Sequence, residues 1–151
     1  MTEPLLPDAL SDLLDAAVDE SEAIGNDSRY ELYMFSWHLP ETRSDGSQIR
    51  GVCLVCMAGA LIARRLRASI EEPTFPDRFE DDIAAKLFAI DALRRGDLFE
   101  LLAVRMPREE AKQVALRTAT LQIRTHFDRE LGRADWAVYR AAAAVLRGAG
   151  L

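Results

Sequence analysis

Apolar residues recur at helical spacing along most of the 151-residue chain. Near the amino terminus they follow an i, i+3, i+4, i+7 pattern, with acidic residues mostly on the other side: Leu10, Leu13, Leu14 and Ala17. This pattern is typical of an amphipathic helix, which Gly25 is expected to end. Comparable stripes predict four more helices, over 76–96, 97–106, 108–131 and 136–148.

The aromatic segment YELYMFSWH, residues 30–38, is less regular. The preceding Ser28 and the following Glu31 fit a capping box, which favours a short helix. An alternation through Tyr33, Phe35 and Trp37 would fit a strand, but the cap favours the helix. Pro40 is expected to stop this element, and the segment LPETRSDGS is predicted to be an exposed loop.

The longest apolar run of the chain extends from Gly51 to Ala63 and holds 13 residues. It is apolar on every side, which is typical of a helix that is buried on every side. Arg64, Arg65 and Arg67 follow it, where cations suit the end of a helix. We therefore predict a buried central helix over about residues 48–68.

No strand signal is strong, so the predicted fold class is all-α. The length of 151 residues fits a single domain over 1–151. We expect an irregular or orthogonal bundle of six to seven helices around the central helix. The apolar run is shorter than the ~20 residues that span a bilayer, so no membrane partner is expected.

Two further features indicate a cytoplasmic protein. Residues 1–7 are acidic and contain proline, unlike the basic start of a signal peptide. Only two cysteines occur, Cys53 and Cys56, and their i, i+3 spacing in a helix does not suit a disulfide. Both observations favour a reducing compartment. No cofactor is expected, and a homo-oligomer is compatible with the sequence.

Charge is distributed unevenly along the chain. Residues 1–50 carry a net charge of −8 (3 basic against 11 acidic), residues 51–100 carry −2 (7 against 9), and residues 101–151 carry +4 (9 against 5). The acidic first helix could face a basic partner through a stripe formed by Asp12, Asp15, Asp19 and Glu20. The favoured alternative is that the two ends of the chain neutralise each other within the fold.

Trp37 and His38, with the loop that follows them, form a second candidate contact site. The loop contributes Glu41, Arg43 and Asp45. A tryptophan beside an exposed loop suits a ligand or a protein partner. The favoured alternative is a core tryptophan and a histidine that caps its helix, because no orienting group for a catalytic histidine is recognisable.

The cysteines and histidines of the chain form one further set with potential chemistry. Cys53, Cys56, His38 and His126 together match a Cys2His2 zinc site in composition. Buried core cysteines are favoured, because the neighbours are apolar and His126 lies on a distant helix. The acids of the segment 77–82 occur in the first turns of a helix, where acids are expected without any metal.

Nucleic-acid binding is the least favoured of these hypotheses. The segment 97–119 reads as helix, short break and helix, which is compatible with a helix-turn-helix. The basic residues that would contact DNA are Arg108, Lys112, Arg117 and Arg124. However, Pro107 occupies the turn, Glu109 and Glu110 open the second helix, and phosphate binding would require the opposite charge there.

One segment resembles a known group of proteins. The sequence SWH, followed by a polar loop and CLVCMAGALIA, is similar to small uncharacterised phage and prophage proteins. The shared pattern is Trp-His followed by Cys-x-x-Cys-x-Ala-Gly, over residues 34–66. The resemblance implies a bacterial or phage origin and a cytoplasmic role, and it carries no catalytic residues to this chain.

The sequence therefore predicts a non-enzymatic protein-interaction module. No G-x-S-x-G, P-loop, dinucleotide-binding or H-E-x-x-H motif occurs, so an enzyme is not favoured. With the resemblance, we expect a phage- or prophage-encoded modulator or inhibitor of a host protein, such as host-defence or nucleic-acid-handling machinery. Two alternatives stay open: a DNA-binding regulator that uses the basic carboxy-terminal half, and a metal or small-ligand site near His38, Cys53 and Cys56.

Overall fold

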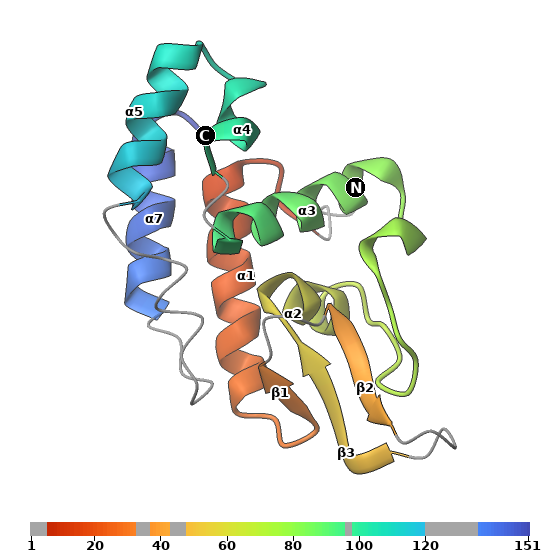
Figure 1. Ribbon diagram of the computed structural model, residues 1–151. Coiled ribbons are helices and arrows are strands. Elements are labelled where there is room, and N and C mark those ends of the chain that lie inside the picture. The colour runs from red at the N-terminus through yellow and green to blue at the C-terminus, as the bar shows by residue number, and fades with distance from the viewer. Residues whose placement is uncertain (1–5, 33–36, 43–47, 96–97, 120–135) are drawn as a thin grey trace, which may run out of the picture.

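A computed structural model describes residues 6–32, 37–42, 48–95, 98–119 and 136–151 (Figure 1). Within these ranges the chain forms six α-helices, one short 3-10 helix and three β-strands. The helices are α1 (Leu10–Gly25), α2 (Met57–Arg64), the 3-10 helix η1 (Pro76–Arg78), α3 (Asp81–Arg95), α4 (Leu98–Ala103), α5 (Arg108–Ala119) and α7 (Trp136–Gly148). The strands are β1 (Tyr30–Leu32), β2 (His38–Thr42) and β3 (Gln48–Val55).

The all-α prediction is confirmed only in part: the described chain is mostly helical, but a small mixed sheet accompanies the helices. The strand order is β1-β3-β2, with β1 parallel and β2 antiparallel to the central β3. The predicted helix over 28–38 is replaced by β1 and by the start of β2, as far as the structure describes this segment. The predicted stop at Pro40 is also wrong, because β2 is an edge strand, where a proline without an N–H is tolerated.

The predicted central helix over 48–68 is also wrong in its first part, because β3 occupies residues 48–55. A short continuous apolar run has no periodicity that would separate a strand from a helix. The β-branched Val52 and Val55 favour the strand. The second part is confirmed as a buried helix, since residues 57–63 of α2 are all buried.

The inner face of the sheet packs against helices. One rung across it consists of Tyr30, Cys53 and Pro40, and the next rung on the same face consists of Leu32, Val55 and His38. Cys53 and Val55 are completely buried and cluster with Ile24 of α1 and with Ala60 and Ala63 of α2. The sheet is therefore one wall of a second, smaller apolar cluster beside the main helical core.

Helix α1 contacts α2, α3, α7 and β1 and supplies much of the main core. It runs beside α7 in Figure 1, and the ion pairs between the two helices show that they are antiparallel.

The predicted end of the first helix at Gly25 and the predicted end of the last helix at Gly148 are confirmed by α1 and α7. The predicted helix over 76–96 begins later, at Asp81, after η1. Helix α5 is described to Ala119, and the rest of the predicted 108–131 helix lies outside the described residues.

Helix α2 packs unusually close to the start of β2. A Cβ atom added at Gly59 would overlap the carbonyl oxygen of Trp37 and would lie 2.7 Å from its carbonyl carbon. The same atom would approach Val55 of β3 to 3.1 Å. Only a glycine allows this contact, so Gly59 fixes the distance between α2 and the backbone that carries Trp37.

None of the described helices is long and apolar enough to cross a membrane.

We predict that Gly59→Ala destabilises the protein by about 1–3 kcal/mol, because backbone atoms must move to accept the methyl group. This loss exceeds the gain of up to ~1 kcal/mol that alanine normally brings to a helix over glycine. Denaturant unfolding measures the difference. Gly148→Ala in α7 is the matched control, because nothing lies within 4 Å of the added carbon. Equal stability of the two variants would contradict the close contact.

Candidate functional site

Two aromatic side chains from distant parts of the chain meet at the surface. Trp37, just before β2, and Phe88, on α3, form an edge-on pair with ring centroids 5.6 Å apart and an interplanar angle of 83°. Trp37 packs partly against the main core, whereas Phe88 is 50% exposed. An edge-to-face pair of this kind holds both rings in a defined orientation. Half of the phenylalanine surface nevertheless stays available to a partner.

A third exposed aromatic residue, Phe75, lies next to a segment that is bound to the start of β2. Phe75 is 46% exposed and follows Thr74, whose N–H donates to the carbonyl oxygen of His38 at 2.9 Å. Because His38 follows Trp37, this hydrogen bond brings Phe75 to the same edge of the sheet. We call Trp37, Phe75 and Phe88 the aromatic surface.

An acidic segment adjoins the aromatic surface. It runs from η1 into the first turn of α3 and contains Asp77, Glu80, Asp81 and Asp82, all exposed. The single base within it is Arg78, whose guanidinium lies 3.9 Å from the carboxylate of Glu72. The segment as a whole is therefore negatively charged. We call these four acids the acidic margin.

His38 does not reach the surface, contrary to what a ligand-binding role would require. It is completely buried, and its Nδ1 lies 3.1 Å from the carbonyl oxygen of Glu72. Its Nε2 is buried without a hydrogen-bond partner in the described part of the chain. Burial lowers the pKa of His38, because the charged imidazolium loses its hydration. The ring is thus held neutral between β2 and the residues after α2.

We predict that folding stability decreases as pH falls below about 6.5, the usual histidine pKa. The unfolded chain binds a proton at His38 there while the folded chain resists it, so protonation favours unfolding. Denaturant unfolding between neutral and mildly acidic pH measures the slope. His38→Gln should lose this slope. An unchanged slope in His38→Gln would contradict the assignment.

The two cysteines occupy different environments and do not form one metal-binding pair. Cys53 lies on the inner face of β3, where burial raises its pKa to about 11. Cys56 caps the start of α2, and its Sγ accepts a hydrogen bond from the N–H of Gly59 at 3.3 Å. Both thiols are buried in the reduced state. No group of three His, Cys, Asp or Glu side chains suited to a metal occurs among the described residues, and His126 lies outside them.

The acidic stripe of α1 is neutralised within the protein. Arg147 of α7 binds the carboxylates of Asp12 and Asp15 at 3.0 and 2.9 Å. Arg140, two turns earlier, binds Asp19 at 2.7 Å and also reaches Glu22. Glu20 faces the other way, toward Arg64 and Arg65 at the end of α2, at 3.4 and 3.5 Å. These acids are occupied by intramolecular ion pairs, as expected from neutralisation between the two ends of the chain.

We predict that Arg140→Gln destabilises the protein by about 0.5–1 kcal/mol at low salt, since exposed ion pairs contribute no more. The loss should shrink at about 1 M salt, where the screening length falls to roughly 3 Å. Thermal or denaturant unfolding at the two salt concentrations measures both effects. Lys112→Gln on α5 is the control, an exposed base with the same change in charge. A loss that is the same at both salt concentrations would contradict an electrostatic origin.

Three of the candidate DNA-binding residues, Arg108, Lys112 and Arg117, are exposed on α5. The guanidinium of Arg108 lies over the ring of Phe99, 5.1 Å from its centroid. Arg124 lies outside the described residues. Glu109 and Glu110 are exposed in the first turn of α5, where they would repel phosphate.

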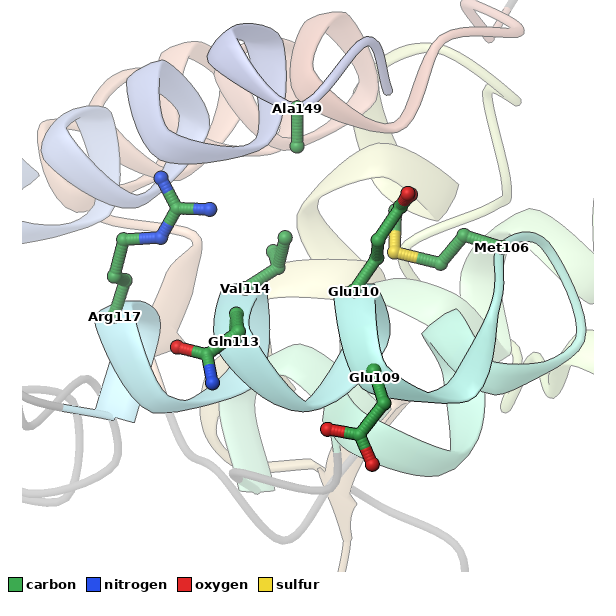
Figure 2. A pocket seen from close by; sticks show the side chains of 7 residues that line it. All are labelled: Met106, Glu109, Glu110, Gln113, Val114, Arg117 and Ala149. Carbon is green, nitrogen blue, oxygen red and sulfur yellow. The ribbon is translucent and has the colours of Figure 1, made fainter.

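An open pocket of about 320 Å³ lies between α5 and the end of α7 (Figure 2). Figure 2 shows Glu110 and Arg117 directed toward α7, with Val114 between them, whereas Glu109 points away. The remaining lining residues are Met106, Gln113 and Ala149. The pocket thus combines one acidic and one basic side chain at opposite ends of an apolar floor. It offers no set of groups with a recognisable catalytic arrangement.

The polar loop after Trp37 is described only in part. Glu41 belongs to β2, but its side chain lies outside the described part of the structure, as do Arg43 and Asp45 altogether. Of the predicted contact residues, the structure therefore brings Trp37 to a surface, buries His38 and pairs the acids of α1. The loop residues stay predictions.

Phe75 and Phe88 were not predicted from the sequence to be contact residues. A signal for Phe88 exists, because the apolar stripe of this helix is Phe79, Ile83, Leu87, Ile90 and Leu93. Phe88 lies off that stripe, and a large apolar residue on the polar side of an amphipathic helix is a candidate contact residue. The partner ring, Trp37, could not be assigned, since its neighbour in space is far away in sequence.

No protein-family model matches this chain, and no curated protein and no solved structure is significantly similar to it.

Proposed function

We propose that this protein is a non-enzymatic protein-interaction module that binds its partner through the aromatic surface. The observation that carries the proposal is the half-exposed Phe88, held edge-on against Trp37. Tryptophan and other aromatic residues are enriched at protein interfaces, where they supply much of the binding energy. A ring whose orientation is already fixed loses little conformational freedom on binding.

The aromatic surface replaces α1 as the preferred contact site. Binding a basic partner through α1 would require the carboxylates of Asp12, Asp15 and Asp19 to release Arg140 and Arg147. The energy of the new ion pairs would be offset by the loss of the existing ones. Phe88 carries no such cost, because half of its side chain already faces solvent.

The biological role rests on the sequence pattern over 34–66. The resemblance to phage and prophage proteins supports a modulator or inhibitor of a host protein that acts in the cytoplasm. That role stays a prediction, as does the single-domain organisation over 1–151. The DNA-binding and metal-site alternatives are less well supported, given the carboxylates at the start of α5 and the separate environments of the two cysteines.

We predict that the protein captures a stoichiometric protein partner from a nuclease-treated lysate of cells that naturally contain it, and that Phe88→Ala loses this partner. Hot-spot aromatic residues contribute about 2 kcal/mol or more to binding, so the loss should be at least about thirtyfold. Quantitative capture with tagged wild-type and variant protein measures it.

The control is Leu116→Ala on α5, which removes a side chain that is 53% exposed on a helix separate from α3 (Figure 1). Circular dichroism and unfolding curves must show that both variants fold, since Phe88→Ala is expected to cost only about 1 kcal/mol of stability. Equal capture by Phe88→Ala and wild type would contradict the proposed surface. A partner that is lost in Leu116→Ala alone would place the contact on α5 instead.

A further inference from the structure

We infer that the aromatic surface binds a basic polypeptide segment that carries an apolar anchor side chain. This inference rests on the proposed function, because it adds the chemistry of the partner to the same surface. Exposed aromatic rings and the unpaired carboxylates of the acidic margin together point to this partner.

The acidic margin lies in reach of a segment that contacts Phe88. Asp81 is seven residues before Phe88 on α3, which is almost two full turns, so both side chains project from the same face of the helix. The helical rise places them roughly 10 Å apart along the axis. A bound segment in extended conformation would cover this distance with three or four residues. Of the three basic residues of α3, Arg94 and Arg95 occur at its opposite end, and Lys86 is paired with Asp8 at 2.8 Å.

The acidic margin differs from the acids of α1 in its neighbours. Each acid of the α1 stripe is paired with an arginine of α2 or α7. In the described part of the chain, Asp77, Glu80, Asp81 and Asp82 have no ion pair. The nearby bases are directed elsewhere, Arg78 to Glu72 and Lys86 to Asp8. Among the residues that the structure describes, one acidic surface is thus neutralised internally, whereas the four acids of the acidic margin stay unpaired beside exposed aromatic rings.

This combination selects one class of partner. Lysine or arginine side chains would be attracted to the acidic margin, which raises the association rate and sets the direction of the bound segment. Their guanidinium or ammonium groups also interact favourably with the faces of exposed aromatic rings. An apolar anchor residue would cover the exposed half of Phe88. Nucleic acid is repelled by the same carboxylates, so the expected partner is a polypeptide.

The test uses three synthetic peptides of equal length with the full chain. One carries a leucine anchor with flanking lysines, the second has glutamates in place of the lysines, and the third keeps the lysines but has alanine as anchor. Binding is followed by NMR through the Trp37 indole and the Phe88 amide signals. We expect the lysine–leucine peptide to bind most tightly, with affinity that falls between about 10 and 150 mM salt as the screening length drops from roughly 30 to 8 Å.

Two double variants separate the charge from the rings. Asp81→Asn/Asp82→Asn should weaken the lysine–leucine peptide about two- to fivefold, as expected for losing exposed ion pairs. Glu109→Gln/Glu110→Gln on α5 makes the same change in net charge away from this surface and should leave the affinity unchanged. Equal losses in the two double variants would show a general charge effect and would overturn the inference.

The remaining outcomes distinguish the inference from the proposed function. If the glutamate–leucine peptide binds as tightly as the lysine–leucine peptide at the Trp37 and Phe88 signals, the aromatic surface stands and the basic partner is wrong. If no peptide shifts these signals, both the inference and the surface are wrong. Concentration-dependent shifts of these signals without peptide would identify a second copy of the chain as the occupant, which also overturns the inference.

Discussion

The contact between the backbone carbonyl of Trp37 and the Cα of Gly59 determines how the sheet meets the helices. No other residue at position 59 leaves room for this carbonyl oxygen. At this contact the start of β2 lies against α2, the next residue, His38, is buried, and the indole of Trp37 meets Phe88 of α3. The aromatic surface is therefore a consequence of core packing, and a change at Gly59 would alter it without touching an aromatic residue.

The ion pairs between α1 and α7 depend on the core, because apolar packing brings the two helices together. Arg140 and Arg147 occur one heptad apart on α7, and the acids of α1 recur at similar spacing on the facing helix. Antiparallel packing matches the two sets, so the strongly acidic start of the chain and its basic end neutralise each other. Surface pairs of this kind contribute little stability individually, but they define which acids stay available for a partner. The acids of the acidic margin are among those that stay available, and they form a negative surface beside Phe88.

Sequence periodicity predicted the parts of the fold that local pattern controls. The stripes of α1, α3 and α7 specify helices that are polar on one side, and their positions were correct to within a few residues. The sheet was not predicted, for two reasons. In the aromatic segment the capping box outweighed the alternation through Tyr33, Phe35 and Trp37, and the apolar run shows no alternation that distinguishes strand from helix. The same limit applies to the site: Trp37 was recognised as a candidate, but its pairing with Phe88 depends on contacts between segments about fifty residues apart.

The position of Phe88 has a further implication. An exposed phenylalanine on the polar side of α3 contributes little to the core, and a polar residue there would improve solubility at almost no cost in folding stability. Its edge-on contact with Trp37 is too small to offset this disadvantage, since such a pair is worth only about 1 kcal/mol. Under the proposed function, the exposed apolar area of Phe88, which is unfavourable in the free protein, would become favourable once a partner covers it.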